Sequence, residues 1–130
     1  GLSRYINILG PKYNEDKYDI LSASDVFVFP TFYTNECFPL VLLEGMQFGL
    51  PIVSTFEGAI PEIVDDGING FLVNQKDTNS LADKLETLIK DKDLRKSMGE
   101  ASRKKFLENY TLITFKENIE KVIHQTLYLK

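Results

Sequence analysis

One continuous apolar run, Asp25-Val26-Phe27-Val28-Phe29-Pro30, constrains the fold of this chain more than any other feature. The run has the length of a β-strand, and it lacks the alternation of apolar and polar residues that a strand with one wet face shows. A strand of this kind is expected to be buried on both faces, as in a parallel sheet. The chain must then supply helices that cover the sheet, because parallel strands are joined by helical crossovers.

Strand and helix patterns alternate along the first half of the chain, and the second half is helical. Strands are predicted at 5–9, 26–29, 51–55 and 71–73, and helical segments at 16–23, 39–48, 61–64, from Asp77 or Thr78 onward, at about 93–109 and from Thr111 onward. On the helix that follows Asp77, the residues expected to face the core are Leu81, Leu85, Leu88 and Ile89. This order predicts an α/β fold with a parallel sheet, and the 130 residues fit a single domain over 1–130.

Composition excludes several classes of protein. The net charge is −4 and no stripe of Lys and Arg is present, so the electrostatic signature of a nucleic-acid-binding protein is missing. The single cysteine, Cys37, permits no internal disulfide, which favours a reducing, cytoplasmic location, and one Cys with one His supplies no metal cluster. The most apolar window, Phe38 to Leu43, is too short to span a bilayer.

The start of the helix predicted at 39–48 is a candidate anion site. If Pro39 is the first helical residue, the backbone N–H groups of Leu40 and Val41 have no acceptor within the helix. Phe38, the residue at the N-cap, has no side-chain acceptor for them. A helix start with free amides is positively polarised and suits a phosphate. The alternative is that water or a loop carbonyl occupies it.

Two carboxylates flank this helix start. Glu36 lies just before it, and Glu44 can lean back toward it, because helical side chains point toward the N-terminus. Carboxylates in contact with a phosphate would repel it, but they accept hydrogen bonds from neutral hydroxyls beside it. A nucleoside diphosphate sugar offers such hydroxyls on its ribose and on its sugar. Glu44 also lies in an apolar stretch where a carboxylate needs a partner. The alternative is that it faces solvent.

Three sequence segments follow one another along the chain and together form a recognisable pattern. They are 21–30, the run Glu36-Cys37-Phe38-Pro39-Leu40-Val41-Leu42-Leu43-Glu44 with Gly49 to Val53 behind it, and Gly58 to Val73. Together they resemble the group 1 glycosyltransferases (family four), whose signature is E-x7-E. The resemblance covers nearly the whole chain.

This resemblance implies a GT-B enzyme, in which two Rossmann-like domains face each other and the C-terminal one holds the donor. The chain would be that C-terminal domain, a partial Rossmann-like parallel sheet flanked by helices and lacking its first strands. Glu36 would contact the transferred sugar as the catalytic residue, and Glu44 would contact the ribose. The other donor-binding residues that the likeness indicates are Phe38, Pro39, Leu40, Val41 and Gly58, with Lys12 and Tyr13 bordering the nucleobase.

The same resemblance sets expectations for chemistry and partners. The parent enzyme would transfer a sugar from a nucleotide-diphospho-sugar with retention of configuration, and would need no metal and no cofactor. Its N-terminal acceptor domain would be a partner, and peripheral membrane association of the parent is compatible with the family. The chain lacks that domain, two strands, and a loop whose Arg and Lys neutralise the pyrophosphate, so we expect a domain fragment with little activity alone. A stand-alone nucleotide- or sugar-binding module without catalysis is the alternative.

The absent strands would expose an apolar edge. In the strand order 3-2-1-4-5-6, the strand at 26–29 would lack its inner neighbour. We expect either that residues 5–9 pair with it directly or that a second copy covers it in a homodimer. The last helix offers another dimer surface, because Phe115, Ile119 and Ile123 share one face. Cys37 replaces the family's usual Gly, and we interpret it as a small apolar filler in preference to a reactive thiol.

Overall fold

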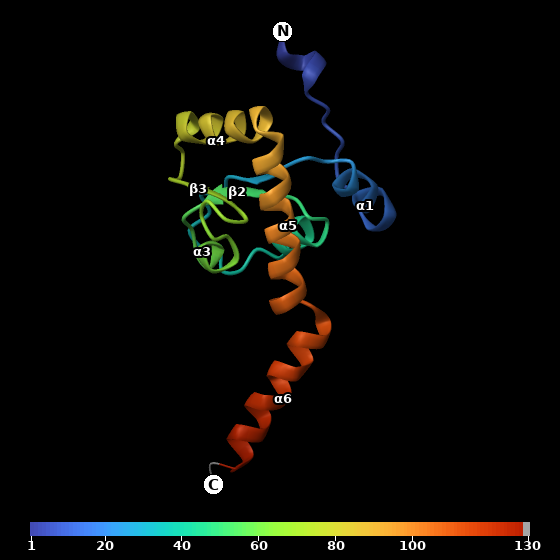
Figure 1. Ribbon diagram of the computed structural model, residues 1–130, viewed down its shortest axis with the longest axis vertical. Coiled ribbons are helices and arrows are strands. Elements are labelled where there is room, and N and C mark those ends of the chain that lie inside the picture. The colour runs from blue at the N-terminus through green and yellow to red at the C-terminus, as the bar shows by residue number, and fades with distance from the viewer. Residues whose placement is uncertain (129–130) are drawn as a thin grey trace.

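A parallel sheet lies at the centre of the computed structural model, which describes residues 1–128 (Figure 1). Its strands are β1 (Phe27–Phe29), β2 (Ile52–Thr55) and β3 (Gly70–Val73), in the order β1-β2-β3. Val53 of β2 lies opposite Val28 on one side and Phe71 on the other. The predicted α/β class is confirmed. The carboxyl ends of the three strands therefore share one edge of the sheet.

The predicted helices are present, with shifts of a few residues at their ends. Their bounds are η1 (Leu2–Tyr5, a 3-10 turn), α1 (Asn14–Ser22), α2 (Leu40–Gln47), α3 (Ile60–Ile63), α4 (Thr78–Lys90), α5 (Lys92–Asn109) and α6 (Leu112–Tyr128). Two of the predicted caps are confirmed. Asp77 accepts a hydrogen bond from the amide of Ser80 at 3.0 Å, and Thr111 accepts one from the amide of Thr114 at 3.2 Å.

Helices bury β2 from both sides. On one face, a core cluster joins α2, α3 and the sheet through Leu42, Met46, Ile52, Ile60, Ile63, Val64 and Leu72. On the other face, α4 and α5 cover the sheet through Val53, Phe71, Leu88 and Met98. The two-sided burial predicted for β1 is only partly met, because Val28 is 39% exposed and β1 is an edge strand with which no other strand than β2 pairs among residues 1–128.

One predicted core residue of α4 faces solvent. Leu88 is fully buried, whereas Ile89 is 72% exposed. Side chains of adjacent helix residues point about 100° apart. Only one row of side chains along α4 contacts the sheet, and Ile89 lies outside that row. The prediction for Ile89 is therefore wrong.

Gly45 brings α2 unusually close to the sheet. A Cβ at this position would lie 2.8 Å from Cγ of Phe27 and 3.0 Å from Cδ1 of Ile52. The backbone of α2 thus packs directly on a ring of β1 and a side chain of β2. This contact sets the depth at which α2 lies, and with it the position of its N-terminus.

The first residues do not form the predicted strand. Leu2–Tyr5 makes one 3-10 turn, residues 6–13 have no regular secondary structure, and Ile8 is 94% exposed. Among residues 1–128, β1 pairs with β2 alone, so the hypothesis that residues 5–9 pair directly with β1 is wrong. A β-rich run becomes a strand only where a neighbour completes its hydrogen bonds, and in the expected strand order its neighbour is not β1. Coverage of the edge by a second copy stays a prediction.

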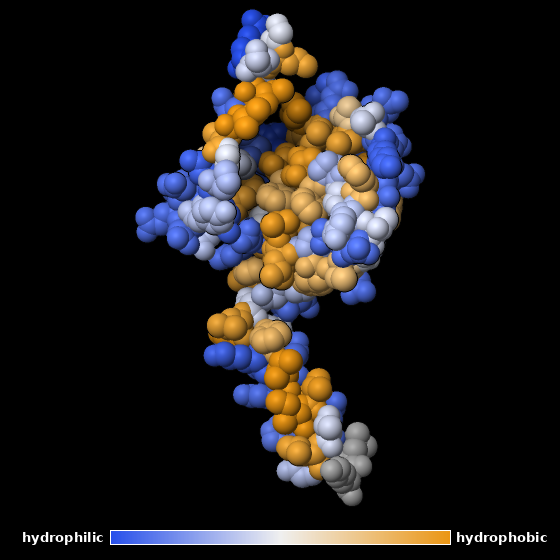
Figure 2. Space-filling model, turned by 180° about the vertical axis from the view of Figure 1, so that it is seen from behind, coloured by the Kyte–Doolittle hydropathy of each residue, from blue (hydrophilic) through white to orange (hydrophobic). Residues whose placement is uncertain are grey.

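The last helix leaves the body of the molecule, as Figure 1 shows, and carries the expected apolar stripe along its length (Figure 2). Its exposed apolar residues include Leu112, Phe115, Ile119, Val122 and Ile123. A groove of about 680 Å³ runs between the start of α6 and residues 38–43. Within residues 1–128, no helix combines the length and the apolar character that crossing a membrane requires.

The neighbours Leu88 and Ile89 give a matched test of the packing of α4. We expect Leu88→Ala to lower the free energy of unfolding by about 2–5 kcal/mol, because it opens a cavity between α4 and the sheet. Ile89→Ala, on the solvent side of the same turn, should change it by no more than about 0.5 kcal/mol. Urea denaturation of both variants measures the difference, and equal losses would contradict the observed orientation of α4.

Candidate functional site

Two hydroxyl groups of β2 hold the chain that leaves β1. Ser54 Oγ donates to the carbonyl of Phe29, and Thr55 Oγ1 donates to the carbonyl of Thr31, each at 2.6 Å. Both β2 residues are buried. The loop at 30–39 is therefore tied to the carboxyl edge of the sheet before it carries Glu36 to the start of α2.

The segment around Glu36 packs against the loop that follows β2. The amide of Ala59 donates to the carbonyl of Cys37 at 2.9 Å. Gly58 has a φ of +50°, and a Cβ there would lie 1.8 Å from the carbonyl oxygen of Glu36. Two predicted site residues, Glu36 and Gly58, are thus brought together, and the contact requires a glycine.

The helix α2 begins one residue later than predicted. Pro39 is the N-cap, with an extended ψ of 104°, and Leu40 is the first helical residue, so Phe38 is not the cap. The carbonyl of Pro39 accepts the amide of Leu42 at 3.1 Å, a bond of the 3-10 type in the first turn. Within residues 1–128, the amides of Leu40 and Val41 have no acceptor and no side chain caps the helix. The free amides inferred from the sequence are present.

Glu44 has a partner on α1 that the sequence analysis did not identify. Lys17 Nζ lies 2.6 Å from Glu44 Oε1, and the two side chains are 31% and 36% exposed. The hydrogen bond to Glu44 raises the pKa of Lys17 above its ordinary value, although partial desolvation opposes the rise. The ring of Tyr18 stacks on Phe48 with the centroids 5.8 Å apart, so α1 docks on the side of α2 through two neighbouring residues. Glu44 is thus paired while a third of its side chain stays exposed, and its contact with a ribose stays a prediction.

Three further predicted residues, Lys12, Tyr13 and Cys37, make no side-chain hydrogen bond to α2 in the part of the chain that the structure describes. Tyr13 is the N-cap residue of α1 and is 73% exposed, with Lys12 just before it. Within the described chain neither one bonds to α2, and their contact with a nucleobase stays a prediction. Cys37 is exposed, so its interpretation as an apolar filler is wrong. The backbone of this loop makes the contact with the neighbouring loop, which leaves the thiol outside.

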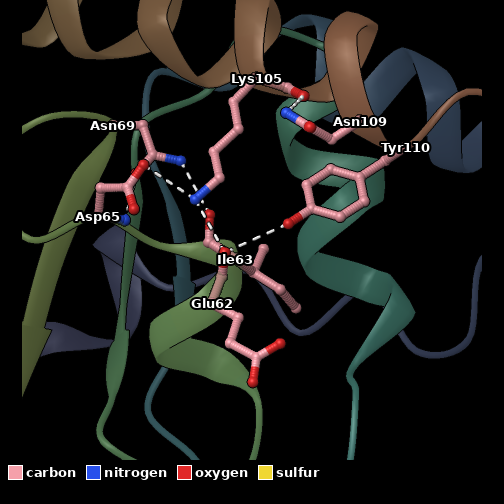
Figure 3. A network of polar contacts seen from close by, with 7 residues as sticks. All are labelled: Glu62, Ile63, Asp65, Asn69, Lys105, Asn109 and Tyr110. Carbon is pink, nitrogen blue, oxygen red and sulfur yellow. Dashed lines mark hydrogen bonds and ion pairs between the residues drawn. The ribbon is translucent and has the colours of Figure 1, made fainter.

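A polar network fastens α5 to the end of α3 (Figure 3). Lys105 Nζ donates to the carbonyl of Glu62 at 2.8 Å and pairs with Asp65 at 2.9 Å. The hydroxyl of Tyr110 donates to the same Glu62 carbonyl at 3.2 Å, and burial, with the nearby carboxylates, raises the pKa of that hydroxyl. Asn69 Oδ1 accepts the amide of Asp65 at 2.7 Å. These contacts fix α3, and with it the loop that carries Gly58.

The arrangement can bind an anion flanked by hydroxyl groups. Free amides at the start of a helix attract negative charge, and the carboxylates of Glu36 and Glu44 can accept hydrogen bonds. Among residues 1–128, no group of three or more His, Cys, Asp and Glu side chains is placed to hold a metal ion. The site is thus built from backbone amides, two glutamates and one lysine.

Comparison with solved structures identifies the class of this domain. HepE from Anabaena, crystallised in complex with UDP-glucose, matches 87% of this chain and 31% of its own with a TM-score of 0.78 at 23% identity. The C-terminal domain of LpcC, a group 1 glycosyl transferase family protein from Francisella tularensis, matches 82% of this chain and 53% of its own with a TM-score of 0.69 at 30% identity. The fold is that of the C-terminal domain of GT-B glycosyltransferases.

The family follows from the sequence comparisons. The model described as "Glycosyl transferases group 1" matches residues 1–105, and the chain belongs to this family. D-inositol 3-phosphate glycosyltransferase of Corynebacterium jeikeium is 40% identical over 100 residues, which are 77% of this chain and 23% of that protein. N-acetyl-alpha-D-glucosaminyl L-malate synthase of Bacillus anthracis is 37% identical over 92 residues, 71% of this chain and 24% of that protein. The chain spans about a quarter of the length of these curated relatives.

The contact between Gly58 and Glu36 can be tested against a second glycine with positive φ. Gly67 has a φ of +80° but nothing within 4 Å of the place of a Cβ. We expect Gly67→Ala to cost about 1 kcal/mol of unfolding free energy for its backbone conformation alone. Gly58→Ala should cost roughly 3 kcal/mol, because the loop at 36–37 must also move aside. Urea denaturation measures both, and amide NMR signals of residues 36–41 should shift in Gly58→Ala only. Similar spectra for the two variants would contradict the packing of these loops.

Proposed function

We propose that the parent protein of this chain transfers a sugar from a nucleoside diphosphate sugar to an acceptor with retention of configuration, and that this chain binds the donor. The observation that carries the proposal is the start of α2. There the amides of Leu40 and Val41 are free, Glu36 precedes them, and Glu44 is held one turn further along the helix. Membership of the group 1 glycosyltransferases supports the reaction class.

In this proposal the pyrophosphate lies at the start of α2. The bond between the sugar's anomeric carbon and the phosphate oxygen breaks with the electron pair going to the leaving nucleoside diphosphate, whose negative charge grows. The amides of Leu40 and Val41 stabilise that charge, since they already point away from the helix and need no rearrangement. The acceptor hydroxyl then bonds to the anomeric carbon on the face that the leaving group vacates, and its proton passes to the leaving phosphate.

The two glutamates bind hydroxyl groups on either side of the pyrophosphate. Glu36 is placed by the contact of its backbone with Gly58, and it contacts the transferred sugar. Glu44 uses one oxygen for Lys17 and contacts the ribose with the other. Lys12 and Tyr13, just before α1, border the nucleobase.

The structure of HepE with UDP-glucose makes UDP the first nucleotide to test, with GDP beside it. We propose that the reaction needs no cofactor besides the nucleotide sugar, and that the acceptor binds to a separate N-terminal domain of the parent. A chain with a single cysteine is suited to the reducing cytoplasm, where we place the reaction.

The ribose contact predicts a loss of nucleotide affinity in Glu44→Ala. We expect the Kd for UDP or GDP to rise about tenfold or more, because a hydrogen bond to a charged group is worth about 1.5–3 kcal/mol. Isothermal titration of the parent protein measures the change, with Glu100→Ala, an exposed residue of α5, as the control. Full affinity in Glu44→Ala would refute the assignment.

The sugar contact predicts a different pattern for Glu36→Ala. The Kd for the free nucleotide should stay within about twofold, since Glu36 contacts the sugar and not the nucleotide, while kcat falls at least about a hundredfold. Titration with the nucleotide and release of nucleoside diphosphate from the nucleotide sugar separate the two quantities. A wild-type parent that binds nucleotide sugars but never transfers the sugar would favour the alternative, a binding module without catalysis.

A further inference from the structure

Among residues 1–128, the only ion pair that reaches α2 joins Glu44 to Lys17 of α1. The partners are 27 residues apart in sequence, and their bond is short, at 2.6 Å. Of the six ion pairs among residues 1–128, three instead join neighbouring turns of one helix and are largely exposed, such as Lys90 with Glu86. The pair of Lys17 and Glu44 is therefore a tertiary contact built at the proposed donor site.

An unpaired Glu44 would oppose the proposed ligand. Glu44 lies four residues after Leu40, about 6 Å along the helix axis, and its side chain leans toward the N-terminus. A full negative charge at this distance from a diphosphate weakens binding severalfold at a partly solvated site. The same carboxylate is needed as an acceptor for a ribose hydroxyl. The site therefore has to keep the carboxylate of Glu44 as a hydrogen-bond acceptor and compensate its negative charge.

We propose that Lys17 is a positioning residue for the nucleotide: it holds one oxygen of Glu44 and cancels the charge, so that a diphosphate and a ribose bind side by side. Glu44 Oε1 accepts Lys17, whereas no donor among the described residues reaches Oε2, which is left for the ribose. The hydrogen bond to Glu44 raises the pKa of Lys17, which favours the charged ammonium. This inference rests on the proposed function.

The charge of Lys17 can be removed without undocking α1. The stack of Tyr18 on Phe48 also holds α1 against α2, and only its outer ring, that of Tyr18, lies near the ammonium group, at 5.8 Å from the ring centroid. Lys17→Met keeps an unbranched apolar stem of similar length and loses the charge. If Lys17 had a purely structural role, a folded variant would bind the nucleotide with unchanged affinity. If the substitution undocked α1 instead, affinity would fall, and a second substitution at Glu44 would not restore it.

The test compares the Kd values for UDP and GDP, by isothermal titration, in the parent protein and its variants. We expect Lys17→Met to weaken binding about five- to tenfold, since the charge of Glu44 becomes uncompensated. Lys17→Arg should stay within about twofold of the wild type, and Lys17→Met combined with Glu44→Gln should recover to within about threefold, because the carbonyl of Gln still accepts the ribose without a charge. Lys90→Met, which breaks the exposed pair on α4, is the charge-matched control and should leave Kd unchanged.

Each outcome separates this inference from the proposed function. A wild type that binds neither nucleotide overturns the proposed function, and the inference with it. A wild type that binds while Lys17→Met binds equally well overturns the inference alone. A double variant no tighter than Lys17→Met also overturns it, because the loss would then come from altered packing and not from the charge of Glu44.

Discussion

The hydroxyl groups of Ser54 and Thr55 lie inside the sheet, and both donate to carbonyl groups of the chain that leaves β1. Polar groups inside an apolar strand are costly unless they are paired, and here the pairing has a second effect. It directs the loop after β1 along the carboxyl edge of the sheet, where Glu36 meets Gly58 and α2 begins. The placement of Glu36 beside Gly58 depends on this fixed path.

Most of the fold was predictable because its signals are local and strong. The apolar runs of β1, β2 and β3 and the amphipathic pattern of α4 and α5 identify the elements, and Asp77 identifies a helix start. The errors come from what a local signal does not contain. The β-rich run at 5–9 has no neighbouring strand, and Ile89 lies one helix position away from the row that meets the sheet.

The candidate site was predictable where its residues share one segment. Glu36, Leu40, Val41 and Glu44 follow one another around a single helix start, so their spacing places them together. Lys17 was missed, because its contact depends on how α1 docks against α2, and no sequence pattern links positions so far apart. The exposure of Cys37 was missed for a related reason, since it follows from the backbone contact of its loop with Ala59.

The close approach of α2 at Gly45 has a consequence for how such a domain can vary. Any side chain at this position would collide with Phe27 and Ile52 and lift the helix off the sheet. The helix would carry the amides of Leu40 and Val41 with it, away from a loop that Ser54 and Thr55 hold in place. The position of the free amides at the carboxyl edge of the sheet is therefore set by the absence of a Cβ at Gly45 in the interior. Substitutions on the solvent side can change which ligand is preferred. A substitution at Gly45 would instead displace the amides relative to Glu36, and this would affect the binding of every ligand.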